Sequence, residues 1–292
     1  MAKRGTSERT RPGGTAFRLA LTLPGAAVTL GLILFALALL CVLAFRFNDG
    51  SLFGAGFTLG NFRILATEPL YGLVILRSLV IAGLVTAATV VTAYPVAFYL
   101  SFHARSRGLI LFLVTLPFWT SYLLRVFAWK IVLAYNGVLN SGLMAAGIWS
   151  EPSTAFLNTP AAVVLTLAHA YAPFAILPIL VSLDAIPRSL TEAAADLGAR
   201  PFTVFRRIIL PNSMPGVLAG AVVVFVPTVG DYVTPALVGG PNSTMIGSLI
   251  QAQFGKAQDW PFGSAIALVV MLVILVVILG VRRIDRRFGS RA

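Results

Sequence analysis

Charged residues are scarce in this sequence of 292 residues. Asp, Glu, Lys and Arg together make up 11% of the chain, whereas an ordinary soluble domain carries about a quarter. Hydrophobic residues make up 58%. The formal net charge is +12, but the charges fall in short intervals between long uncharged runs. A nucleic-acid-binding protein needs a charged folded surface, so this pattern indicates a membrane protein and no nucleic-acid partner.

The residues used by enzymes and metal sites are also few. Cys41 is the single cysteine and lies in an apolar run, which excludes an intrachain disulfide and a cysteine-based metal site. His103 and His169 are too far apart in sequence for a metal-ligand motif. The phosphate-binding motif G-x-x-x-x-G-K-[ST] is missing, as are G-x-S-x-G and H-E-x-x-H. Nothing here indicates an enzyme, and we expect this chain to bind no metal or cofactor itself.

Apolar runs long enough to cross a bilayer occur six times. A transmembrane helix needs about 20 mostly apolar residues. The sequence therefore predicts an all-α integral membrane protein whose six transmembrane helices comprise one at 19–45 and five in a core at 70–281, near 72–102, 108–135, 160–183, 214–237 and 261–281. The first run is longer than the apolar region of a signal peptide and precedes no small-residue cleavage site, so we expect it to remain as an anchor.

Lysine and arginine are distributed unevenly between the two ends of these helices. Sixteen of the 22 lie in the segments 1–18, 103–107, 184–207 and 282–292. Because basic loops stay on the cytoplasmic side, the sequence predicts that both termini are cytoplasmic. Residues 1–18 and 282–292 are then basic cytoplasmic tails, and we expect the first to be disordered.

The segment 184–213, between the fourth and fifth spans, is the longest of the predicted cytoplasmic loops. Its pattern predicts a short helix around Glu192, a left-handed turn at Gly198, and a second helix that begins at Pro201 and ends at Pro211. Two short helices at the membrane face indicate a docking element. An ordinary amphipathic surface loop is the alternative.

This segment resembles the EAA motif of permease subunits of ABC importers. Three residues separate Glu192, Ala193 and Ala194 from Gly198, nine separate Gly198 from Ile208, and one separates Ile208 from Leu210 and Pro211. The resemblance implies the type I ABC-importer fold and a location in the bacterial inner membrane. It also implies that a coupling helix docks on a separate ATPase through the motif residues, which are Glu192, Ala193, Ala194, Gly198, Ile208, Leu210 and Pro211.

Other segments resemble one branch of that family, the spermidine/putrescine permeases. They are Leu116–Arg125 with Trp129 and Asn136–Asn140, Gly230–Pro235 with Gly239–Pro241 and Met245–Gly247, and Asp259–Pro261. The resemblance covers about residues 70–281. It implies that the chain imports a small solute by alternating access, and it favours a polyamine as that solute.

The resemblance further implies several partners. ATP and Mg²⁺ would be bound by a dimer of the partner ATPase, and a periplasmic binding protein would deliver the substrate. The chain would pair with a second permease subunit, and the resemblance favours a paralogue over an identical copy.

A path for a polycation should offer carboxylates and aromatic faces, because these replace lost hydration. Asp231 is the strongest candidate because a carboxylate within a membrane segment is functional by default. The aromatic candidates, for which packing is the alternative role, are Trp119, Tyr122, Tyr171 and Tyr232. Arg125 and Lys130 would favour an anionic substrate if they faced the path. We expect them to be structural, either reaching the headgroups or, for Arg125, pairing with Asp231.

Two other functions remain open at this stage. An ABC permease for an amino-acid-like or anionic solute would share the coupling motif. A secondary transporter would explain six spans interrupted by proline, but inverted repeats, which such folds often carry, are not evident.

Overall fold

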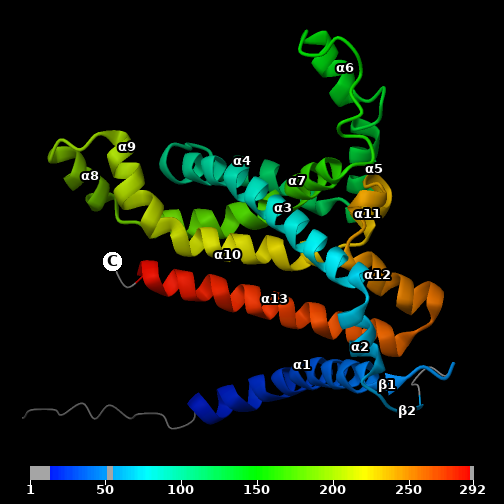
Figure 1. Cartoon of the computed structure of the whole chain (residues 1–292). Coiled ribbons are helices and arrows are strands. Elements are labelled where there is room, and N and C mark those ends of the chain that lie inside the picture. The colour runs from blue at the N-terminus through cyan, green and yellow to red at the C-terminus, as the bar shows by residue number, and fades with distance from the viewer. Residues whose placement is uncertain (1–13, 51–54, 290–292) are drawn as a thin grey trace, which may run out of the picture.

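In the computed structural model, which describes residues 14–50 and 55–289, five long helices run in roughly similar directions (Figure 1). Each is long and apolar enough to cross a membrane. They are α1 (Gly14–Ala44), α3 (Pro69–Phe102), α7 (Pro160–Asp184), α10 (Leu210–Val229) and α13 (Trp260–Gly289). Within α1, the apolar span is Leu23–Ala44. This helix begins inside the expected N-terminal tail, whose first 13 residues lie outside the described residues.

The remaining span, expected near 108–135, is broken. It consists of α4 (Arg107–Thr115), a 3₁₀ turn at Leu116–Trp119 and α5 (Tyr122–Val132). The two halves, Arg107–Trp119 and Tyr122–Val132, meet at 93°. Pro117 cannot donate to the helix, and the chain becomes extended at Thr120. With this pair counted as one span, the described chain has up to six candidate spans.

Shorter elements connect the spans. A two-stranded antiparallel hairpin, β1 (Arg46–Phe47) with β2 (Ala55–Phe57), joins α1 to α2 (Gly60–Thr67). The others are α6 (Val138–Ala145), α8 (Arg188–Asp196), α9 (Pro201–Val204), a π turn (Phe205–Ile209), α11 (Val233–Val238), a 3₁₀ turn (Pro241–Ser243), α12 (Ile246–Ala252) and a second π turn (Gln253–Ala257). In Figure 1, α6 lies in an arm that projects away from the long helices.

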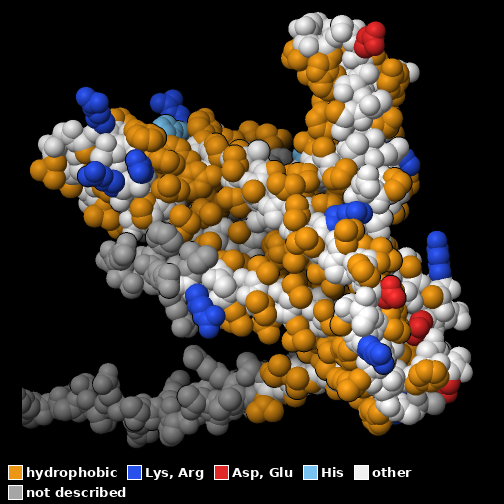
Figure 2. All heavy atoms as spheres, viewed as in Figure 1, with side chains coloured by type: hydrophobic (Ala, Val, Ile, Leu, Met, Phe, Trp, Pro, Cys, Tyr) orange, Lys and Arg blue, Asp and Glu red, His pale blue; other side chains and the backbone are white. Residues whose placement is uncertain are grey.

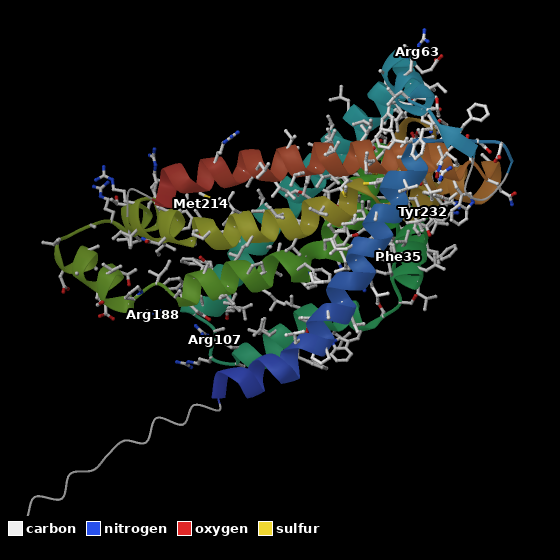
Figure 3. The ribbon with its side chains drawn as sticks, turned by 90° about the horizontal axis from the view of Figure 1, so that it is seen from below. Phe35, Arg63, Arg107, Arg188, Met214 and Tyr232 are labelled. Carbon is white, nitrogen blue, oxygen red and sulfur yellow. The ribbon has the colours of Figure 1, made fainter. Side chains whose placement is uncertain are left out.

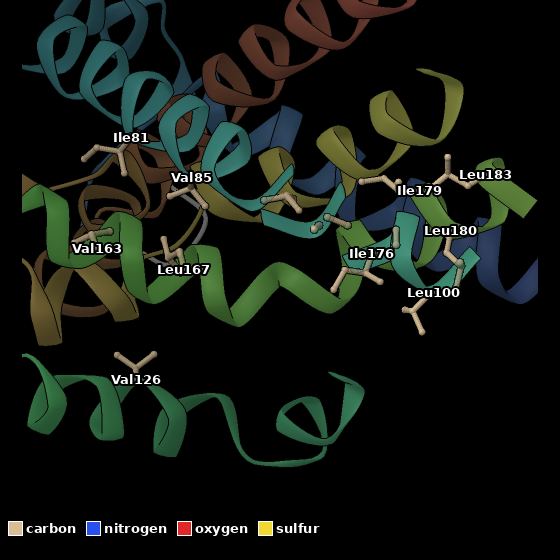
Figure 4. Close-up of a cluster of buried hydrophobic side chains, with 14 of the residues drawn as sticks. Ile81, Val85, Leu100, Val126, Val163, Leu167, Ile176, Ile179, Leu180 and Leu183 are labelled. Atoms are coloured by element: carbon tan, nitrogen blue, oxygen red, sulfur yellow. The ribbon is translucent and has the colours of Figure 1, made fainter. Parts of the chain in front are cut away.

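The core lies where α3, α7 and α10 pack together. Ile81 and Val85 of α3 meet Val163 and Leu167 of α7 in one buried cluster (Figure 4). A second buried cluster joins α3 and α12 to α13. By contrast, only 6% of the apolar window of α1 is buried within the chain. A helix that is apolar all round and exposed in this way is placed in lipid or against another membrane helix.

Two glycines of the sequence G-x-x-x-G let α10 approach α7 closely. A Cβ added to Gly216 would lie 2.4 Å from the Cβ of Ser182 and 2.5 Å from the carbonyl oxygen of Pro178. A Cβ on Gly220 would lie 3.2 Å from the carbonyl oxygen of Ala175. This spacing is typical of closely packed membrane helices.

Pro211 does not end the second helix of the loop, as expected, but lies inside a helix that continues into the membrane. The helix runs without interruption over Pro201–Val229. The π turn widens the helix just before Pro211, and Leu210 donates to the carbonyl of Phe205. A π bulge accommodates a residue that cannot maintain the ordinary pattern of hydrogen bonds.

The helix expected near 214–237 is also divided. It ends at Val229, and the chain resumes as α11 at Val233. Gly230, Asp231 and Tyr232 form the connection, which places Asp231 at a helix break within the molecule.

The described parts of the four basic segments lie at one end of the molecule. The loop after α3, the α8–α9 segment, the start of α1 and the end of α13 are all on the left in Figure 1. In Figure 2, one group of Lys and Arg side chains lies near α8 and α9 and others lie toward the opposite end, where all the Asp and Glu side chains in view are found. That this end is cytoplasmic stays a prediction.

Candidate functional site

The α8–α9 turn is held by backbone hydrogen bonds that only a left-handed residue allows. Gly198 has φ +76°. Its amide donates to the carbonyl of Ala195 at 2.8 Å, and the amide of Ala199 donates to the carbonyl of Ala194 at 3.0 Å. These two bonds form a Schellman motif, which favours glycine at this position. Pro201 begins the next helix, as the sequence predicts.

The outer surface of this turn is apolar although it lies in a loop. Leu197 is 89% exposed and Phe202 is 72% exposed. Glu192 and Ala193 are exposed beside them, and Ala194 is half-buried. Sequence reasoning did not select Leu197 and Phe202, although apolar residues on both sides of a loop glycine were visible. An exposed apolar patch of this kind is typical of an interaction surface.

The second half of the motif connects this surface to the membrane core. Ile208 and Leu210 are half-buried and Pro211 is exposed, while Ile209 between them is buried. All four belong to the continuous helix Pro201–Val229. A displacement of the turn would therefore act directly on α10.

The structure brings Asp231 and Tyr122 into direct contact. The hydroxyl of Tyr122 donates to Oδ2 of Asp231 at 2.7 Å and pairs with the hydroxyl of Thr234 at 2.7 Å (O–O). Oδ1 of Asp231 accepts from the amide of Val233 at 3.0 Å. Asp231 as a whole residue is 8% exposed. The contact joins the two broken spans, because Tyr122 begins α5 and Asp231 precedes α11.

The other candidate path residues are not all part of this contact. Tyr171 is half-buried and close enough to Asp231 to interact with it electrostatically. Trp119 is 82% exposed and lies at the break of the third span. Tyr232 is 46% exposed and lines an open pocket of about 510 Å³ with Phe254. Thr234 is a member of the buried contact that the sequence did not reveal.

Arg125 has backbone carbonyls as its partners, which its charge alone did not identify. It does not pair with Asp231. Its guanidinium donates to the carbonyls of Pro117 and Thr120 at the break of the span, and to the carbonyl of Ala170 on α7 at 3.4 Å. Within a bilayer, freed backbone groups must find partners inside the protein, so Arg125 stabilises the bend. Lys130 is exposed.

The comparison with known proteins identifies the family. The pattern of the family described as "Binding-protein-dependent transport system inner membrane component" matches residues 15–290. The chain belongs to this family. Such proteins are membrane transport components rather than enzymes, and this permease is a multi-pass protein of the inner membrane. Among the described residues, no group of three or more His, Cys, Asp or Glu side chains gathers as metal ligands.

The permease is similar to two curated relatives. One is the "Spermidine/putrescine transport system permease protein PotB" of Haemophilus influenzae, 39% identical over 242 residues, or 82% of this chain and 84% of that protein. The protein of the same name from Escherichia coli is 37% identical over 245 residues, or 84% and 88% of the two chains.

A solved structure shares the fold. It is that of a bacterial alginate ABC transporter in complex with an alginate pentasaccharide-bound periplasmic protein. The TM-score is 0.69 at 17% identity, and the alignment covers 93% of each chain. The permease therefore has the fold of type I ABC importers.

Proposed function

We propose that this permease is a membrane subunit of an ABC importer that carries polyamines such as putrescine and spermidine. The observation that carries the proposal is the 37–39% identity, over more than four fifths of the chain, to two permeases named for these solutes. Both relatives are also covered over more than four fifths of their own length. Similarity of this extent includes the α8–α9 turn at Gly198, called the coupling turn from here on, and the helix break at Asp231.

The buried carboxylate supports a cationic substrate. Asp231 lies at a break between two helices, with Tyr122 in contact and Tyr171 nearby. A carboxylate and aromatic rings replace the hydration of an ammonium group. The guanidinium of Arg125 contacts backbone carbonyls, so Asp231 stays available to a substrate cation.

The apolar turn between α8 and α9 supports a partner ATPase at the basic end of the molecule. In this proposal a dimer of that ATPase binds ATP and Mg²⁺, and Glu192, Gly198 and the exposed Leu197 contact it. A periplasmic binding protein delivers the solute at the opposite end; the solved alginate transporter is likewise in complex with a periplasmic protein. A second permease subunit, in the first place a paralogue, covers the exposed helices.

The mechanism that follows is alternating access. Closure of the ATPase pair moves the coupling turn, and the continuous helix Pro201–Val229 transmits this movement to the break at Asp231. The packed helices then exchange between two discrete arrangements. The Tyr122–Asp231 contact opens and closes in this exchange, so that the carboxylate meets the substrate in one arrangement only.

Ligand binding by the cognate binding protein tests the identity of the substrate. Transport by the complete complex in proteoliposomes tests the function as an ABC importer. We expect the binding protein to bind putrescine or spermidine in preference to amino-acid-like and anionic solutes, and the loaded protein to stimulate ATP hydrolysis. Binding of an anionic solute instead would contradict the polyamine assignment and leave the permease assignment standing. Uptake driven by an ion gradient without ATP would indicate a secondary transporter.

A further inference from the structure

A cluster of side chains joins the ends of α3 and α7 to the starts of α4 and α8. The hydroxyl of Ser101, at the end of α3, donates to Oδ1 of Asp184 at 2.6 Å. Arg107 forms an ion pair with the same oxygen at 3.4 Å and approaches Oδ2 at 3.5 Å. Asp184 is the last residue of α7, and Arg107 is the first residue of α4. With Arg188, these residues are called the junction cluster.

Two guanidinium groups of the cluster converge on one backbone carbonyl. Arg107 and Arg188 both donate to the carbonyl oxygen of Ser101, the second at 2.6 Å. Arg188 also lies over the ring of Phe102, with its Cζ 4.6 Å from the ring centroid. This carbonyl is among the last four of α3, which have no partner within their own helix. Arg188 is the first residue of α8, so the coupling helix is attached directly to the end of α3. Figure 3 shows Arg107 and Arg188 at the same end of the molecule.

The placement of these charges opposes the preferences of their own helices. Asp184 lies at the C-terminus of α7, and Arg107 and Arg188 lie at the N-termini of α4 and α8. A helix dipole disfavours an acid at the first of these positions and a base at the other two. The contacts between helices therefore account for the charges, and the preferences within each helix do not.

The cluster is also too exposed to be explained by stability. The side chains of Arg107 and Asp184 are 42% and 39% exposed, and exposed ion pairs contribute little to folding free energy. Its contacts restrain the relative orientation of α4 and α8, two helices that are far apart in the sequence.

We propose that the junction cluster makes the coupling helix α8 and the start of α4 move as one unit. Arg107 and Asp184 are then positioning residues for transport. α4 is the first half of the broken span whose second half carries Tyr122, the partner of Asp231. The coupling turn would thus act on both sides of the Tyr122–Asp231 contact, through α10 on one side and through the bent span on the other. This inference rests on the proposed function as an ABC permease but not on the identity of the substrate.

A distance measurement in the complete transporter tests the joint movement. Spin labels are placed at Ser189→Cys on α8 and Leu109→Cys on α4, both exposed, with Cys41→Ser and cysteine-free partner subunits. We expect the same distance in the nucleotide-free and the ATP–vanadate-trapped states. When the spin-labelled protein also carries Asp184→Asn or Arg107→Gln, the distance between the labels should differ between the two states. Arg105→Gln, which removes the same charge from an exposed position in the same loop, should behave as the parent.

Transport efficiency provides the second readout. For Asp184→Asn and Arg107→Gln, spermidine taken up per ATP hydrolysed should fall roughly threefold or more, and the double variant should be no worse than the worse single one, as for a coupled pair. The amount of copurified ATPase should stay constant. A distance that changes in the parent, or single-variant losses that multiply in the double variant, would overturn the proposal. If the parent takes up no spermidine while the distances behave as expected, the polyamine assignment fails and the junction cluster stands.

Discussion

At the scale of single residues, Asp231 is buried although it lies in the membrane-spanning part of the chain. Its two carboxylate oxygens accept from the hydroxyl of Tyr122 and the amide of Val233. A buried carboxylate needs such partners because an unpaired charge in a low dielectric is costly. An ammonium group of a substrate could replace the Tyr122 hydroxyl as the partner of Oδ2, and this exchange would bind the cation without leaving the carboxylate unpaired.

Replacing this charge tests the exchange. Asp231→Asn retains an oxygen that accepts from Tyr122 but removes the attraction for a cation, so uptake of spermidine should fall about tenfold, which corresponds to about 1.4 kcal/mol. The measurement is initial uptake into proteoliposomes at matched amounts of protein. Tyr122→Phe, which keeps the carboxylate, should retain more uptake than Asp231→Asn. Normal uptake by Asp231→Asn would exclude this residue from the path.

Arg125 illustrates a charge whose role is structural. Arg125→Met would leave the carbonyls of Pro117 and Thr120 without this donor at the bend, and we expect the unfolding free energy to fall by about 2–3 kcal/mol. The measurement is thermal unfolding in detergent. Lys130→Met, at an exposed position five residues later, is the matched control and should unfold as the unchanged protein does. Equal stability of both variants would contradict this role.

At the scale of elements, the α8–α9 turn depends on one backbone conformation. Nothing lies within 4 Å of a Cβ added to Gly198, but its φ of +76° is strained for any other L residue and most of all for a β-branched one. Gly198→Val should therefore reorient the turn, at a cost of about 1–2 kcal/mol, without preventing membrane insertion.

The expected result for Gly198→Val is loss of transport with an inserted protein. Uptake and ATP hydrolysis are measured together, and hydrolysis should no longer respond to the loaded binding protein. Gly198→Asn is the control, because asparagine adopts the left-handed conformation more readily, and it should retain most of the uptake. Full uptake by the valine variant would show that the turn does not couple transport to hydrolysis.

The packing of α10 on α7 depends on close approach rather than on conformation. Gly216→Leu places a side chain where a Cβ would already lie 2.4 Å from Ser182, so the helices must separate. Overpacking of this kind costs about 1–3 kcal/mol, and the midpoint of thermal unfolding should fall. Gly83→Leu on α3, where nothing lies within 4 Å of an added Cβ, should leave the midpoint nearly unchanged. Equal midpoints would mean that the approach of the two helices is not tight.

At the scale of the whole molecule, orientation follows from the placement of charge. Ser150 lies before α7 and Ser189 lies after it, so the two residues are at opposite ends of this membrane helix. Cysteines introduced at these positions in a Cys41→Ser background therefore report on the two sides of the membrane. In intact spheroplasts, a membrane-impermeant thiol reagent should label Ser150→Cys and not Ser189→Cys. Both should react once the membrane is permeabilised. The reverse pattern would invert the predicted topology.

The sequence by itself determined the membrane class, the positions of the long helices and the coupling turn. These depend on local properties, because bilayer thickness sets the length of an apolar run and a single glycine at Gly198 allows the left-handed turn. It also singled out Asp231 and Tyr122 as separate candidates. It did not decide which prolines end a helix, because proline composition does not say whether a helix stops, as near Pro117, or accommodates the residue through a π turn, as at Pro211.

Only the tertiary structure decided which distant residues meet. Tyr122 and Asp231 are 109 positions apart, and Ser101 and Asp184 are 83 apart. Arg125 reaches Ala170 across 45 positions, and its carbonyl partners exist only because the span is bent. These contacts follow from how the helices pack, and no pattern within one segment specifies the neighbour of another. The chemistry of this permease was therefore visible in its residue types, whereas the pairing that gives each charge its role was not.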